Sequence, residues 1–219
     1  MEDYRSAFET FANQVKKGVV LFGDDEEVLK LHITTEHLYY GLHDNNDVQA
    51  VNVIQNENGM QFDVLYKKEK FGTFKLPFVG KPLLWNSLGV IAVGIMEGLS
   101  YELLQEGLST FPGVKRRFTT EENKDNVYID DYAHHPTAVK YMIEAARVKY
   151  PGKKVIAIFK PDRYSRIYYF MDRFAQELDK ADEVYLCHFP ENAAKEDGID
   201  ITIQDLADKS SKSCCYCGR

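Results

Sequence analysis

Hydrophobic and polar residues alternate with a period of two in one internal stretch of the chain. Between Val48 and Pro77, apolar residues recur at every second position, as at Phe62, Val64 and Tyr66. The pattern is interrupted at Asn56–Gly59 and again near Gly72. A period of two is typical of strands with one buried face, and such interruptions are typical of hairpin turns. We therefore predict an antiparallel β-meander over this stretch.

Helical patterns lie on both sides of the predicted meander. A first helix carries Ala7, Phe8, Phe11 and Val15 on one face and ends by Gly18, and the apolar run Val19–Phe22 that follows predicts a short strand. After the meander, an apolar segment rich in small residues predicts a buried helix, and the next segment predicts an amphipathic one. These two segments are Trp85–Leu99 and Tyr101–Thr110.

Beyond Phe118 the pattern changes to short apolar strands that alternate with helices. Pro136 is well placed to open a helix that carries Val139, Met142, Ile143 and Ala146 on one face. Such alternation predicts an α/β fold with a mostly parallel sheet and covering helices. We place a domain boundary near Phe118, giving domains 1–118 and 119–219. The predicted elements are the strands Val127–Tyr132, Lys154–Phe159 and Glu183–Phe189 and the helix Arg166–Lys180.

Charge and composition exclude several classes of function. The chain has 27 Lys and Arg residues against 34 Asp and Glu, a net charge of −7, which disfavours sequence-independent nucleic-acid binding. We find no apolar run long enough to span a membrane and no secretory signal at the N-terminus. Free cysteines fit a reducing cytoplasm, where we expect the protein to reside. The sequence does not determine the oligomeric state.

Polar residues gather where the first two strands of the predicted parallel sheet end. Ligands of such sheets bind beyond the carboxyl ends of the strands, so these residues predict a site. Asp131 has a second interpretation, because a carboxylate there could cap the helix that Pro136 opens. The residues are Asp130, Asp131, His134 and His135 after one strand and Lys160, Asp162, Arg163 and Arg166 after the next.

The segment DDYAHHPTAV (Asp130–Val139) resembles the signature of the Mur ligases. The pair of adjacent histidines in this segment resembles the motif of one branch of that family, the enzymes that join L-alanine to UDP-N-acetylmuramic acid. Three further segments resemble the family, so that the resemblance extends to about residue 209. They are NSLGVIAVGIMEGLS (Asn86–Ser100), FPGVKRRF (Phe111–Phe118) and FKPDRYSR (Phe159–Arg166).

This resemblance implies a fold and a reaction. Residues 1–118 would be the C-terminal part of the central ATP-binding domain, and residues 119–219 a Rossmann-like C-terminal ligase domain. With ATP and Mg²⁺ as cofactors, the enzyme would phosphorylate the carboxylate of UDP-N-acetylmuramic acid. The amine of L-alanine would then attack the acyl phosphate. This reaction would belong to the cytoplasmic synthesis of peptidoglycan precursors. Peptidoglycan forms the cell wall, on which cell shape and cell division depend.

The resemblance also implies roles for six residues. The matching asparagine of the family contacts the adenine, the second linker arginine approaches the phosphates, and the aspartate accepts from the ribose. The histidine would lie near the acyl phosphate, and two arginines near the carboxylate of the amino acid, which suits their planar donors. These residues are Asn86, Arg117 and Asp131 for the nucleotide, and His134, Arg163 and Arg166 for catalysis. We assign no metal ligand in this chain.

The sequence departs from the family pattern at several points. Pro82 and Leu83 replace the usual His-Asn pair, and Asp162 replaces a usual histidine. The chain contains no GxxxxGK[ST] phosphate loop and no counterpart of the N-terminal UDP-sugar domain, and its tail differs from the family's ending. We therefore interpret the sequence as a fragment that is inactive alone.

Three other functions stay open at this stage. A sibling ligase attaches a recycled tripeptide to the same sugar nucleotide. A metallohydrolase could use Asp130, Asp131, His134 and His135, and a non-catalytic nucleotide-binding module would need no phosphate loop. In the tail, Cys214, Cys215 and Cys217 could ligate a metal, but zinc sites normally need four ligands at wider spacing, which favours a flexible tail.

Overall fold

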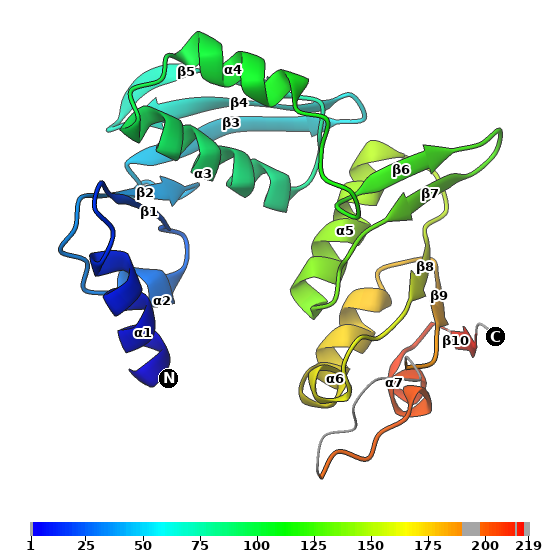
Figure 1. Ribbon diagram of the computed structural model, residues 1–219. Helices are drawn as coiled ribbons and strands as arrows, with labels where there is room; N and C mark the ends of the chain where they lie inside the picture. The colour runs from blue at the N-terminus through cyan, green and yellow to red at the C-terminus, as the bar shows by residue number, and fades with distance from the viewer. Residues whose placement is uncertain (1, 190–197, 213, 217–219) are drawn as a thin grey trace. The chain divides into compact units, whose positions relative to one another are not determined.

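The computed structural model describes residues 2–189, 198–212 and 214–216, and it divides into two compact units (Figure 1). The first unit is Met1–Pro112 and the second is Gly113–Arg219. The division between Pro112 and Gly113 lies inside the segment FPGVKRRF, before its two arginines. The boundary that we predicted near Phe118 is slightly further along the chain. Each unit has its own buried hydrophobic cluster.

The first unit is a five-stranded mixed sheet with helices packed against it. Its strands follow the order β1-β2-β3-β4-β5, with β1, β2 and β3 parallel and β3, β4 and β5 antiparallel. Helix α3 contacts β1, β2 and β3, and α4 contacts β5 (Figure 1). The elements are α1 (Glu2–Asn13), β1 (Val19–Phe22), α2 (Glu26–Leu29), β2 (His37–Gly41), β3 (Val48–Asn56), β4 (Gly59–Tyr66), β5 (Glu69–Leu76), α3 (Lys81–Met96) and α4 (Tyr101–Thr110).

The predicted meander is confirmed, but its second turn was placed wrongly. Strand β4 ends at Tyr66, and the chain turns at Lys67 and Lys68, which both have positive φ angles. Gly72 lies inside β5, where the ring of Tyr101 packs so closely that a Cβ would meet it at 2.2 Å. The glycine therefore makes room for a neighbouring helix, and it does not mark a turn.

Two helices of the first unit differ from their predictions. Helix α3 begins at Lys81, with Gly80 as N-cap and Pro82 in the first turn, so Asn86 lies inside the helix and cannot be its N-cap. In α1 the predicted apolar face is turned outward, because Phe8 is 56% and Phe11 69% exposed while Ala12 is buried. Helix α4 has the predicted bounds, and the Ser100 hydroxyl caps it.

The second unit contains a three-stranded parallel sheet and a separate hairpin. The sheet follows the order β10-β9-β8, and β6 and β7 form an antiparallel pair. The predicted parallel α/β arrangement is confirmed for β8 to β10. The elements are β6 (Thr119–Glu122), β7 (Val127–Asp130), α5 (Pro136–Lys149), β8 (Ile156–Phe159), α6 (Tyr164–Leu178), β9 (Glu183–Leu186), α7 (Ile203–Lys209) and β10 (Cys214–Tyr216).

The hairpin corrects our interpretation of β7 as a strand of the parallel sheet, because β7 pairs with β6. Asn123 makes the turn, because its side-chain oxygen accepts from the backbone N–H groups of Asp125 and Asn126. A polar side chain that closes a turn in this way allows a short, exposed strand such as β6 to pair with β7. The tail also differs from the flexible segment that we predicted, since Cys214–Tyr216 pairs with β9; Cys217 lies outside the described residues.

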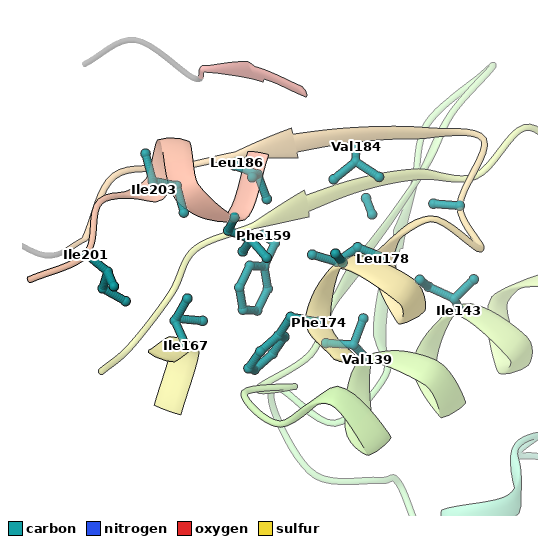
Figure 2. Close-up of a cluster of buried hydrophobic side chains, with 14 of the residues drawn as sticks. Val139, Ile143, Phe159, Ile167, Phe174, Leu178, Val184, Leu186, Ile201 and Ile203 are labelled. Atoms are coloured by element: carbon teal, nitrogen blue, oxygen red, sulfur yellow. The ribbon is translucent and has the colours of Figure 1, made fainter. Parts of the chain in front are cut away.

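Figure 2 shows the core of the second unit, in which Phe174 and Leu178 of α6 meet Val139 and Ile143 of α5 and Phe159 of β8. Helix α7, which we did not predict, adds Ile203 and Leu206 to this core. A capping box between Thr202 and Asp205 starts α7, and that spacing is a signal that sequence reasoning could have used. Among the described residues, no helix is long and apolar enough to cross a membrane.

His135, at the start of α5, is the N-cap of that helix. Its Nδ1 accepts a hydrogen bond from the backbone N–H of Thr137 at 3.3 Å, so this nitrogen carries no proton. The alternative cap, Asp131, is therefore not used for this purpose. Burial, followed by the charges of Arg173 and Arg166, lowers the pKa of His135. The cap thus depends on a neutral imidazole.

We expect the Phe174→Ala substitution to unfold the second unit selectively. Phe174 is fully buried, and removal of such a ring costs about 3–5 kcal/mol because it leaves a cavity. Hydrogen exchange should show lost protection in 113–219 and retained protection in 1–112. Tyr169→Ala, on the same helix but 72% exposed, should change stability by less than about 0.5 kcal/mol. Equal effects of the two variants would contradict this account of the core.

The stability of the second unit should fall as the pH drops below about 6.5, the usual pKa of histidine. A lowered pKa in the folded state means that the unfolded chain binds the His135 proton first, so protonation favours unfolding in that window. His135→Asn keeps a capping side chain but does not titrate, and it should flatten the pH dependence. Thermal unfolding between pH 7.5 and 5 measures this. An unchanged slope in the variant would show that His135 is not responsible.

Candidate functional site

A half-buried carboxylate after β7 holds the segment that leads into the second unit. The Oδ2 atom of Asp131 accepts from the backbone N–H of Phe118 at 2.8 Å, and the backbone N–H of Tyr132 donates to the carbonyl of Arg116 at 2.9 Å. Arg116 and Phe118 have φ angles of 60° and 52°, a left-handed conformation that is unfavourable for residues with a side chain. The hydrogen bonds compensate for that conformation.

The electrostatics of Asp131 reflect this position. Burial raises its pKa, while the Phe118 N–H and the charge of Arg117 act in the opposite direction. The linker backbone and Arg117 thus face the carboxylate. Whether the carboxylate also accepts from a ribose stays a prediction.

Aromatic contacts fix the neighbouring basic groups. The guanidinium of Arg116 lies over the Tyr132 ring, 4.7 Å from its centroid, and the ring of His134 is 4.7 Å from the same ring. The Nδ1 atom of His134 is 2.6 Å from the Tyr132 carbonyl oxygen, so this nitrogen carries a proton and donates it to that oxygen. Nε2 of His134 is then the atom that remains for a ligand.

A second group of basic residues lies where α6 packs against the start of α5, and it contains His135 and Arg173. The ring of His135 packs edge-on against Phe170 at 5.0 Å, and Nη2 of Arg173 is 3.4 Å from the Thr137 hydroxyl. Phe170 interrupts the helical dihedral angles of α6, with φ −122° and ψ 20°. We call the basic residues of these two groups, together with Arg117, Arg163 and Arg166, the basic cluster: Arg116, Arg117, His134, His135, Arg163, Arg166 and Arg173.

Arg163 and Arg166 lie in the first turn of α6, after β8. Arg163 is the N-cap residue, and its side chain makes no cap hydrogen bond. Arg166 pairs with Asp162, with 3.1 Å between Nη1 and Oδ2. Backbone N–H groups and the helix dipole add positive potential at this end. An anion with several oxygens, such as a phosphate or a carboxylate, suits these donors.

The structure brings five of the six predicted site residues into one unit. Asn86 is the exception, because it lies exposed on α3 of the first unit. Sequence reasoning missed Arg173 and Phe170. Arg173 follows Arg166 by seven residues, a spacing that puts both on one helix face, so the signal was present in the sequence. The kink at Phe170 had no such signal.

The acidic and histidine side chains of this region are the ligands that a metal-dependent hydrolase would use. Among the residues that the structure describes, no group of three or more His, Cys, Asp or Glu side chains could hold a metal ion. Asp131 is already engaged by Phe118, and His134 and His135 use Nδ1 for local hydrogen bonds. Among the described residues, these side chains therefore do not assemble the group of three ligands that the metallohydrolase alternative would use.

Similar proteins place the chain in a family. The family model "Mur ligase middle domain" matches residues 1–94, and "Mur ligase, glutamate ligase domain" matches residues 116–214. A UDP-N-acetylmuramate–L-alanine ligase of Pediococcus pentosaceus is 44% identical over 95% of the chain, and one of Lactococcus lactis is 43% identical over 97%. The chain spans 48% of the length of both relatives.

Solved structures share the fold. The UDP-N-acetylmuramate–alanine ligase of Thermotoga maritima superimposes with a TM-score of 0.79 at 24% identity, covering 100% of this chain and 46% of that one. A pseudomurein peptide ligase of Methanothermus fervidus gives a TM-score of 0.73 at 17% identity, covering 98% of this chain and 48% of that one. With a middle-domain match in the first unit and a ligase-domain match in the second, the chain belongs to the Mur ligase family.

Proposed function

We propose that this chain supplies part of an enzyme that joins L-alanine to UDP-N-acetylmuramic acid at the expense of ATP, in peptidoglycan precursor synthesis. The observation that supports this most is the identity of 43–44% over at least 95% of the chain to relatives named for that activity. The chain would contribute part of the middle domain, in residues 1–118, and the C-terminal ligase domain, in residues 119–219.

The basic cluster suits the charges of that reaction. Arg163 and Arg166 would hold the carboxylate of L-alanine, and Arg117 would approach the phosphates of the nucleotide. The amine attacks the acyl carbon of the acyl phosphate, the C–N bond forms, and the C–O bond to phosphate breaks. Nε2 of His134 would lie near that phosphate, where the ring, with a second proton at Nε2, would donate a hydrogen bond to the phosphate oxygens and stabilise the negative charge that leaves.

The nucleotide contacts complete the proposal. Asp131 would accept from the ribose with the carboxylate oxygen that Phe118 does not use, and Asn86 would contact the adenine from α3 of the first unit. ATP and Mg²⁺ are the cofactors of this reaction. The printed sequence has no GxxxxGK[ST] loop to cradle the triphosphate, so we assign to this chain only the contacts named above.

The sibling activity, attachment of a tripeptide to the same sugar nucleotide, has weaker support. A murein peptide ligase of Psychrobacter arcticus has a TM-score of 0.63 at 20% identity, which indicates a common fold and nothing more specific. The identity to the alanine-adding relatives is about twice as high.

A hybrid enzyme tests the proposed function. Residues 1–209 of this chain replace the matching segment of the Pediococcus pentosaceus relative, and phosphate release is measured with ATP and UDP-N-acetylmuramic acid. We expect release that depends on L-alanine. In this hybrid, Asp131→Asn should lower kcat/KM for ATP by at least about 100-fold, roughly 2.7 kcal/mol of transition-state binding, because the ribose contact loses its charge.

The stability of the Asp131→Asn variant separates function from folding. Its raised pKa means that Asp131 favours the fold only at low pH, and this contribution is lost as the pH rises through the folded-state pKa. At pH 7 the asparagine, whose oxygen still accepts from Phe118, should therefore not lower the melting temperature. Asp130→Asn is the matched control, since Asp130 is exposed and makes only a 3.9 Å ion pair to Arg116. A twofold or smaller effect of both variants, or tripeptide-dependent release by the hybrid, would contradict the proposal.

The 219-residue chain alone should not hydrolyse ATP, with or without L-alanine. The reason is that no phosphate loop is present in its sequence to position the triphosphate. Phosphate release by the purified chain, abolished in an Arg117→Gln variant, would show that the basic cluster is sufficient for hydrolysis and would overturn this expectation.

A further inference from the structure

Two arginines in the first turn of α6 have different surroundings. Arg166 donates from Nη1 to the Oδ2 atom of Asp162 at 3.1 Å, and the two side chains are 24% and 44% exposed. The side chain of Arg163 makes no such contact within the part of the chain that the structure describes, and only its backbone carbonyl accepts a hydrogen bond, from the N–H of Ile167. The carboxylate of Asp162 is thus paired with the guanidinium of Arg166, whereas the guanidinium of Arg163 has no such partner among the described residues.

The position of Asp162 makes this contact local. Asp162 directly precedes the N-cap Arg163, and Arg166 is four residues further along, so the ion pair closes over the start of the helix. An oxyanion bound there would be satisfied by the same guanidinium and the same helix end. One carboxylate is already present at that place as part of the chain.

We propose that Asp162 is a specificity-determining residue that an incoming amino-acid carboxylate must displace from Arg166. The inference rests on the proposed function, in which Arg163 and Arg166 hold the carboxylate of L-alanine. Before binding, Asp162 orients and neutralises Arg166. On binding, the substrate carboxylate takes Nη1 of Arg166, and Asp162 turns into the solvent that already reaches it.

The charges around the Asp162–Arg166 pair determine which amino-acid carboxylates can replace Asp162. Arg166 also faces His135, whose pKa it helps to lower, and Arg173 lies on the same face of α6. Asp162 is the carboxylate that pairs with Arg166, so it would place a negative charge beside a carboxylate bound to that guanidinium. A substrate with one carboxylate can replace Asp162 at little cost, whereas a dicarboxylate such as L-aspartate brings a second negative charge toward it.

The expected size of the effect is modest. Exposed ion pairs four residues apart on a helix are weak, and like charges a few ångströms apart in partly exposed positions repel moderately. Removal of the Asp162 charge should therefore tighten L-alanine binding by about two- to fivefold, and L-aspartate binding by about tenfold. Salt should reduce both changes, because these side chains are partly exposed.

The test is a titration of the 219-residue chain followed by NMR of the arginine Nε–H groups. Asp162→Asn should shift the Arg166 signal before any ligand is added, and it should bind L-alanine and L-aspartate more tightly than the unsubstituted chain by these factors. Glu144→Gln removes the same charge from an exposed position on α5 and should change neither affinity. L-Alaninamide, which has no carboxylate, should show no difference between the proteins.

The outcomes separate the inference from the proposed function. If L-alanine shifts the Arg163 and Arg166 signals equally in the unsubstituted chain and in Asp162→Asn, with the same affinity, Asp162 does not compete and the inference is wrong while the carboxylate site stands. An unaltered Arg166 signal in ligand-free Asp162→Asn shows that the ion pair is not formed and also overturns the inference. If L-alanine at up to 100-fold molar excess moves neither signal in any protein, both the carboxylate site and the inference fail.

Discussion

The hydrogen bond from the Phe118 backbone to Asp131 is the contact on which the candidate site depends. It joins the segment that enters the second unit to the end of β7, and it does so with a carboxylate that is half removed from water. Arg116 and Phe118 adopt left-handed backbone angles on either side of Arg117. Without a fixed acceptor, this conformation would relax, and Arg116 would lose its place over the Tyr132 ring.

The same arrangement concentrates positive charge in an acidic protein. The net charge of the chain is −7, but the ends of β7 and β8 carry arginines from the linker and from α6. His135 lies near two of these arginines, and burial together with their charges lowers its pKa, which favours its neutral form and limits the repulsion with the guanidinium groups.

Helix capping illustrates how structure and chemistry share residues here. His135 caps α5, and the same ring packs on Phe170, next to Arg173. His134, its neighbour, uses one nitrogen for the Tyr132 carbonyl and keeps the other for a ligand. The two adjacent histidines thus have different contacts, because the backbone turn before Pro136 directs the His135 ring toward Phe170 and the His134 ring toward Tyr132.

The sequence by itself determined the types of most elements and pointed to candidate site residues after two predicted strands. Periodicity predicted the meander, α4 and the alternation in the second unit, since burial of one face leaves a direct trace in the order of residues. The position of polar residues at strand ends predicted where ligand groups gather. Motif resemblance identified the family, because DDYAHHPTAV combines several residues that few other arrangements would need together.

Only the tertiary structure decided which partners these residues have. Nothing in the local pattern showed that Gly72 makes room for Tyr101, that β7 pairs with β6, or that His135 instead of Asp131 caps α5. Each outcome depends on contacts between segments far apart in the sequence or on competition between two possible hydrogen bonds. The pairing of Asp162 with Arg166 has the same character, because local spacing permits it and only the path of the chain after β8 brings it about.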